Sequence, residues 1–180
     1  MNTTSPDLTL AEPIGNYLIT RDGAQLRLRP AADMDGKILA DFFAKLSPED
    51  VRYRFLDARK WPNEDQITAM LEVDHRRIEH LLAFNTGTGE LIASLMMVAD
   101  AQMETAELAI AVSSAWKGRG IGWTLLRHAR ELAFMRGVKT LRCIEDRSHC
   151  EAIEVEHALG FHQRDIEGEP TLVLLEAEVG

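Results

Sequence analysis

Residues 112–122 read VSSAWKGRGIG, and this stretch decides the fold. An apolar strand pattern ends here, glycines follow at every second position, and an amphipathic helix pattern begins. Glycine lets backbone N–H groups approach a ligand closely, and the first turn of a helix carries unpaired N–H donors with a partial positive charge. The stretch therefore predicts a binding site for a phosphorylated cofactor. A glycine-rich helix start without a ligand is the alternative, although glycine weakens a helix start unless the bare backbone is needed.

The spacing of Gly118, Gly120 and Gly122 separates the known classes of phosphate-binding loop. Trp123 occupies the place of the third glycine in a GxGxxG dinucleotide loop, and no GxxxxGK[ST] nucleotide loop occurs in the sequence. A dehydrogenase or a phosphate-loop kinase is therefore disfavoured.

Composition limits the remaining classes of protein. The chain has 180 residues, 46% apolar and 27% charged, which predicts one domain with a full core. Twenty basic residues against 29 acidic ones give a net charge of −9, which disfavours a nucleic-acid or anionic-membrane partner and favours a cationic substrate. The sequence shows neither a secretory signal pattern nor an apolar run of membrane-spanning length, so we expect a cytoplasmic protein.

Cys143 and Cys150 are too few for a disulfide framework and are interpreted as small residues of a reduced protein. His149 beside Cys150 lacks a second pair of ligands for zinc, so no metal site is predicted. Residues 1–16 are polar and broken by proline, which predicts a flexible arm before a domain at 17–180.

Periodicity and turn residues predict an α/β (α+β) architecture, in which helices wrap a mixed, mostly antiparallel sheet. Strands are expected at 17–20, 25–29, 80–85, 90–98, 105–112, 140–144, 161–164 and 171–175, and the third to fifth of these form an antiparallel meander. Helices are expected at 33–46, from Ser47-Pro48 onward, at 63–73, at 121–137 and at 152–159.

The strand before the glycines alternates bulky and small side chains. Bulky residues point to one face, and the other face is shallow; the two sets are Leu108, Ile110 and Val112, and Glu107, Ala109 and Ala111. The shallow face next to the glycines has room for a thin, extended ligand arm. A half-buried strand with small residues for helix packing is the alternative.

The segment Lys117-Gly118-Arg119-Gly120-Ile121-Gly122 resembles the pyrophosphate loop of the Gcn5-related N-acetyltransferases (GNAT). The pattern of that family is Gln or Arg, two residues, Gly, one residue, then Gly or Ala. The likeness extends over residues 17–175 through Leu26–Pro30, Leu46–Phe55, Val73–Arg77 and Ala106–Ala109, which look like the acetyltransferase domain of bacterial Pat-type protein lysine acetyltransferases.

This resemblance implies a single GNAT-fold domain that transfers the acetyl group of acetyl-CoA directly to a primary amine. A protein lysine is the first expected acceptor and a small-molecule amine the second, and a monomer or homodimer is expected. The resemblance also implies that the backbone of 117–122 holds the diphosphate and that Ile110, Ala111 and Val112 pair with the pantetheine arm where two strands separate. Lys117 keeps a long cation in the first place of the loop but loses planar, bidentate geometry.

Acyl transfer requires a neutral amine, and a lysine with a pKa of about 10.4 must lose a proton at a cost of about 4.6 kcal/mol at pH 7. Many protein-lysine members of the family place a strand glutamate about ten residues before the loop as the general base, which implies this role for Glu107. An exposed glutamate at a strand edge is the alternative interpretation, and Glu104 is the fallback base.

The final helix departs from the family, which often shows Asn, two residues, Ala, and a Tyr four residues later. His149, Ala152 and Glu156 stand at these places, so the tyrosine that would protonate departing CoA is absent. Thiolate is a tolerable leaving group, and water or His149 could supply the proton. His149 is therefore predicted to contact the cofactor, with a helix cap or a surface histidine as the alternative. These departures leave open a catalytically weak acyl-CoA-binding regulatory module.

Overall fold

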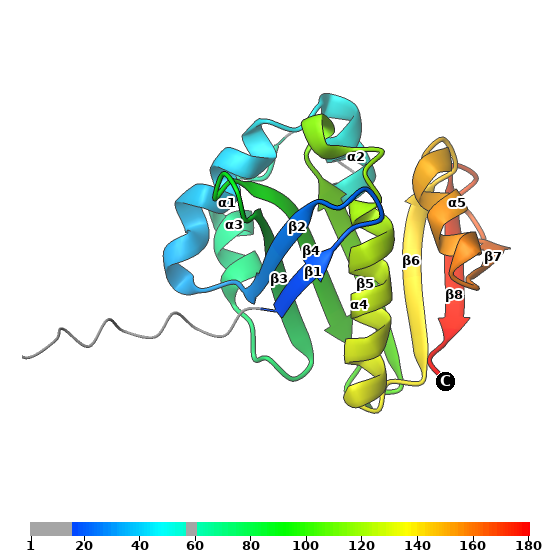
Figure 1. The fold of residues 1–180 in the computed structure, drawn as a ribbon. Helices are drawn as coiled ribbons and strands as arrows, with labels where there is room; N and C mark the ends of the chain where they lie inside the picture. The colour runs from blue at the N-terminus through cyan, green and yellow to red at the C-terminus, as the bar shows by residue number, and fades with distance from the viewer. Residues whose placement is uncertain (1–15, 57–60) are drawn as a thin grey trace, which may run out of the picture.

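The computed structural model describes residues 16–56 and 61–180, and their eight strands form one sheet. The strands are β1 (Asn16–Ile19), β2 (Gln25–Pro30), β3 (Ile78–Asn85), β4 (Leu91–Ala99), β5 (Thr105–Val112), β6 (Thr140–Asp146), β7 (His162–Asp165) and β8 (Leu172–Glu178). Their spatial order is β1-β2-β3-β4-β5-β6-β8-β7. Figure 1 shows the last part of this order, with β6, β8 and β7 side by side at the right. Every neighbouring pair is antiparallel except β5 and β6, which are parallel, so the predicted mixed sheet is confirmed. The predicted arm lies outside the described residues except for Asn16, which begins β1.

Helices connect and cover the strands. They are the 3-10 turns η1 (Asp33–Asp35) and η2 (Ser114–Trp116) and the α-helices α1 (Gly36–Ala44), α2 (Pro48–Phe55), α3 (Glu64–Leu71), α4 (Ile121–Met135) and α5 (Cys150–Ala158). The helix expected over 33–46 differs from the prediction because its first turn is η1 and its α-helical part begins at Gly36. Asp35 rather than Asp33 holds this start, since its carboxylate accepts the Ala32 N–H at 2.7 Å and binds Arg29.

The two faces of the sheet carry separate hydrophobic clusters. Leu125 of α4 and Phe161 belong to the cluster on one face, and Phe43 of α1 and Val51 of α2 belong to the cluster on the other. Leu108 lies in the first cluster and Ala111 in the second, which confirms the predicted alternation of β5. Helices α4 and α5 therefore cover one face of the sheet, and α1, α2 and α3 cover the other.

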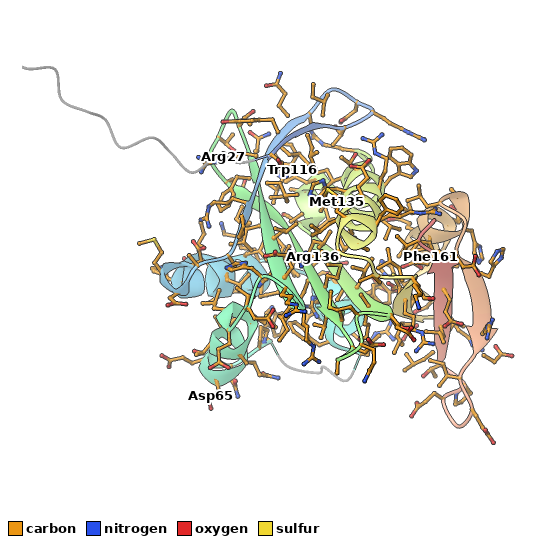
Figure 2. All side chains as sticks on the ribbon, turned by 90° about the horizontal axis from the view of Figure 1, so that it is seen from below. Arg27, Asp65, Trp116, Met135, Arg136 and Phe161 are labelled. Carbon is orange, nitrogen blue, oxygen red and sulfur yellow. The ribbon has the colours of Figure 1, made fainter. Side chains whose placement is uncertain are left out.

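The side chains fill the space between sheet and helices, whereas Asp65 lies on the outer side of α3 (Figure 2). Of the two cysteines, Cys143 is buried and Cys150 is exposed; both are free. No helix in residues 16–56 or 61–180 has the length and apolar character needed to cross a membrane.

The parallel strands β5 and β6 pair over only part of their length. Their register runs from Thr105 opposite Thr140 to Leu108 opposite Cys143 and stops there. Beyond Cys143, β6 continues to Asp146 while paired with β8 on its other side. The second half of β5 thus has an edge that faces away from β4 and carries no strand partner, and this opening positions the site.

Candidate active site

A cleft of about 480 Å³ lies where β5 and β6 separate. Its wall includes Leu108, Ile110, Ala111 and Val112 of β5, together with residues of the glycine loop, α2, α4, β6 and α5. Leu108 is the last β5 residue paired with β6, so it lies at the apex of the opening. The cleft is lined by Ala111 of the shallow face and also by the bulky-face residues of β5. It opens along the strand edge rather than over the shallow face alone, which is a difference from the channel expected from the alternation of side chains.

The glycine loop forms the opposite end of the cleft. Gly118 and Gly120 have φ angles of +71° and +73°, which side chains rarely adopt, and a Cβ added at Gly118 or Gly122 would meet nothing within 4 Å. Helix α4 begins with the Thr124 N–H donating to the Gly120 carbonyl at 3.0 Å. The N–H groups of the three residues between them are therefore outside the hydrogen-bond pattern of the helix, and this 15-residue helix directs its positive end at the cleft.

Cationic and aromatic side chains surround the loop. The Arg21 guanidinium lies 4.2 Å from the ring centre of Trp123, and that of Arg119 lies 4.7 Å from Trp116. Arg21 and both glycines with positive φ, Gly118 and Gly120, line the cleft. The loop end is therefore a positively charged, partly aromatic surface that suits a phosphorylated nucleotide group.

Helix α2 joins both walls of the cleft. The carboxylate of Asp50 accepts hydrogen bonds from Lys117 in the loop and, at 2.8 Å, from Ser114, and Arg52 donates to Asp146 at the end of β6. Burial opposes ionisation of Asp50, but the hydrogen bonds from Lys117 and Ser114 hold its pKa below the usual value. The Lys117 cation is thus engaged by a carboxylate from an element 67 residues away in the chain.

Glu107 lies on β5 immediately before the apex residue Leu108. Its side chain is exposed, and it belongs to the face covered by α2. The nearby charge is the Arg54 guanidinium, whose Nη2 donates to the Met96 sulfur at 3.8 Å and whose buried Nε has no hydrogen-bond partner among the described residues. Burial lowers the pKa of Arg54 to about 10 while the Glu107 charge acts in the opposite direction, so Arg54 remains a cation at neutral pH. The surroundings of Glu107 are therefore solvent and a buried cation.

Residues 40–164 match the model of the acetyltransferase (GNAT) family. The chain belongs to this family. Acetyltransferase PA5475 of Pseudomonas aeruginosa is 24% identical over 147 residues, which cover 80% of this chain and 79% of that protein.

Solved structures of acetyltransferases share the fold. The GNAT domain of S. lividans PAT has a TM-score of 0.83 at 26% identity, over 91% of this chain and 96% of that one. A spermidine N-acetyltransferase from Vibrio cholerae, solved with CoA and spermine, has a TM-score of 0.70 at 14% identity, over 85% of this chain and 95% of that one. The second likeness is one of fold alone.

The enzyme is an acetyl-CoA-dependent N-acetyltransferase, and the residues of the cleft fit that cofactor. Bare backbone at the start of α4 suits the diphosphate, and the basic side chains nearby add charge of the correct sign. The unpaired edge of β5 at Ile110, Ala111 and Val112 offers backbone groups to an extended arm. Among the residues that the structure describes, no group of three or more His, Cys, Asp or Glu side chains is placed to hold a metal ion.

His149 lies in the wall of the cleft at the start of α5. Its Nδ1 lies 2.6 Å from a carboxylate oxygen of Glu145, and its ring stacks on Tyr53 of α2 with ring centres 4.1 Å apart. The side chain makes no capping hydrogen bond to α5, so the alternative role of a helix cap is not what the structure shows. The contact with α2 was not expected from the sequence.

Glu156 is the cleft residue whose surroundings sequence reasoning missed. Its side chain is only 4% exposed, and Cys143 and Glu145 of β6 lie beside it. Burial, and next the charge of Glu145, raise the pKa of Glu156 to about 9, so that it carries a proton at neutral pH. Its spacing from Ala152 and Ile153 puts it on the inward face of α5, which is the signal that could have revealed its burial.

Proposed function

We propose that this acetyltransferase transfers the acetyl group directly to a lysine side chain of a protein, with Glu107 as the general base. The observation that carries the proposal is the position of Glu107, which is exposed one residue before the apex where β5 and β6 separate. A base at the surface is accessible to an amine on a long, protruding side chain. A base enclosed in a deep pocket would instead favour a small acceptor.

The loop and strand have separate duties in this proposal. Backbone N–H groups at 118–122 bind the diphosphate, the free edge of β5 holds the extended arm, and acetyl-CoA supplies an activated acyl group as a thioester. Lys117 supports the loop through Asp50 rather than by direct contact with phosphate. His149 positions the neighbouring carboxylate of Glu145 at the acyl end.

The charge of the protein supports a cationic acceptor. The net charge of −9 attracts lysine-rich surfaces and slows the approach of anionic ones. A cytoplasmic location is part of the proposal and agrees with the free thiols of Cys143 and Cys150.

The test compares Glu107→Gln with Glu104→Gln as a matched control. Glu104 also precedes the apex, but its carboxylate accepts a hydrogen bond from Lys139 at 2.5 Å on the surface. With labelled acetyl-CoA and a protein extract, Glu107→Gln should lose about 100-fold or more in turnover near neutral pH, the usual contribution of a general base. Calorimetry should show acetyl-CoA binding retained in both variants.

Two results would contradict the proposal in different ways. Turnover that survives in Glu107→Gln and falls in Glu104→Gln would move the base to the fallback position. Label that enters only small amines, with no labelled protein, would replace the lysine acceptor with a small-molecule amine and leave the base assignment intact.

A further inference from the structure

Glu156 combines three properties that a structural carboxylate rarely has together. It lines the cleft, its side chain is 96% buried, and its Oε2 atom has no hydrogen-bond partner within the described part of the chain. Although the carboxyl also has hydrogen bonds with Cys143 and Glu145, its position is costly, because burial penalises the charged form and the unpaired Oε2 atom loses its water. The cost is understandable if this carboxyl has a task in the cleft.

Burial and Glu145 favour a proton on Glu156, whereas its hydrogen bond with Cys143 acts in the opposite direction and is outweighed. From β6 it meets Cys143, which is buried and whose thiol has a pKa raised by that burial, and Glu145, which is also bound to His149 of α5. From α4, Arg130 donates instead to the Leu159 carbonyl at 2.9 Å. Across the apex lie Glu107 of β5, whose charge is felt at Cys143, and Arg54 of α2, whose charge is felt at Glu107. Glu156 is thus a protonated carboxylic acid. Its neighbours are the carboxyl of Glu145 and the neutral thiol of Cys143, and the Arg54 cation is more distant.

The apex of the opening is where the acyl end of the cofactor must lie. The diphosphate site is at the glycine loop, and the cleft runs from there along β5 to the level of Leu108 and Cys143, where the strands rejoin. Glu156 adjoins Cys143 on the side of α5, whereas Glu107 lies on the side of α2. A thioester at the apex would have these two carboxyl groups on its opposite sides.

We propose that Glu156 is the general acid of the reaction and donates its proton to the departing sulfur of CoA. This inference rests on the proposed direct transfer. The amine nitrogen forms the new C–N bond, the C–S bond breaks, and its electron pair stays on sulfur. Glu156 gives the sulfur a proton to yield the thiol, and the proton lost by nitrogen goes to Glu107 or to water. After release of products, Glu156 regains a proton from solvent and the base loses one.

The first test is spectroscopic and needs no substrate. Infrared difference spectra of the whole protein without CoA, wild type minus Glu156→Gln, should contain the carbonyl stretch of a protonated carboxyl at pH 7. The band should change when CoA is added, because the thiol would lie beside the acid. A wild-type spectrum without such a band at pH 7 would overturn the inference whatever the acceptor is.

The second test is the pH profile of turnover with whichever acceptor takes up label. Glu156→Gln should reduce turnover by about 100-fold, leave acetyl-CoA affinity unchanged, and remove the decline in rate at high pH that the wild type shows as the acid loses its proton. Glu131→Gln, on the exposed surface of α4, is the control and should keep the wild-type profile. Glu156→Met replaces the side chain with an apolar one of similar size and should lose turnover equally, which covers the case in which the amide fails to fold.

An unchanged profile in either folded Glu156 variant would overturn the assignment. Failure of the lysine proposal is distinguishable, because it would change the identity of the labelled acceptor or the effect of Glu107→Gln without altering the carbonyl band.

Discussion

Glu156 makes the folding of this protein take up a proton, and that uptake is measurable as a pH-dependent stability. In the unfolded chain a glutamate has a pKa of about 4.3 and is ionised from pH 6 to 8. In the fold, burial and the charge of Glu145 raise its pKa to about 9, so it stays protonated over the same range. A carboxyl with a raised pKa stabilises the fold least at high pH, and its contribution is lost progressively as pH rises from the unfolded value to the folded one.

The slope follows from proton counting. The folded state binds one more proton than the unfolded state between pH 6 and 8. For each unit by which pH rises, Glu156 alone therefore lowers the free energy of unfolding by about 1.4 kcal/mol. The difference over that interval is about 3 kcal/mol, a large part of the stability of an ordinary domain. The side chain in Glu156→Gln does not titrate. Between pH 6 and 8 its free energy of unfolding should therefore fall by about 3 kcal/mol less than that of the wild type.

Urea unfolding of both proteins at pH 6, 7 and 8 measures the difference directly. His80 and His128, whose pKa values burial lowers, contribute equally to both proteins and cancel in the comparison. Parallel plots of unfolding free energy against pH would refute the reasoning, since they would mean that Glu156 is ionised in the fold.

Three further substitutions test the scaffold of the site. Gly120→Ala should cost about 1–2 kcal/mol in urea unfolding, because the residue has a φ of +73°, and it should weaken acetyl-CoA binding in calorimetry. Gly122→Ala lies within α4 with ordinary helical φ, so it should gain up to about 1 kcal/mol of stability; any loss of acetyl-CoA binding would then report the added methyl group in the cleft. Asp35→Asn should cost about 3 kcal/mol at pH 7, because it removes the carboxylate that accepts two 2.7 Å hydrogen bonds from Arg29. The Arg29 hydrogen bonds lower the pKa of Asp35, so this stabilisation is present above pH 3.8 and disappears as pH falls through the lowered value; equal differences at pH 7 and pH 2 would contradict the argument.

Features that depend on neighbours in the sequence were predictable. The glycines of the loop, the Ser47 cap that accepts the Asp50 N–H at 3.1 Å, and the alternation of β5 all follow from short-range chemistry. The place where β5 and β6 separate does not follow from short-range chemistry, because it depends on a register between strands more than 30 residues apart; only the resemblance to the family implied a separation beside Ile110–Val112. The Lys117–Asp50 pair is a similar case, since it joins residues 67 positions apart in the chain and no local pattern indicates it.

Glu156 shows how the same limit applies to chemistry. The sequence identifies a glutamate where the family often has tyrosine. The residue type alone does not show whether its carboxyl is exposed on the helix surface or buried. The difference comes from the packing of α5 on β6, which removes water from one oxygen and brings Glu145 close. Only the fold, by burying the Glu156 carboxyl, keeps it protonated and neutral at the cleft.

The sheet lies between the carboxyl groups of Glu107 and Glu156. This separation would let one fold both remove a proton from the amine and donate a proton to the sulfur of CoA. Glu107 is exposed on the α2 side of β5, and Glu156 is buried on the α5 side of β6. Two carboxyl groups on the same side and in contact would share one proton and titrate together. Separated by the strands, each has a distinct environment, and different environments are how proteins assign acid and base roles to like residues. The separation of β5 and β6 therefore does more than admit the cofactor: it leaves an acyl group at the apex within reach of both sides.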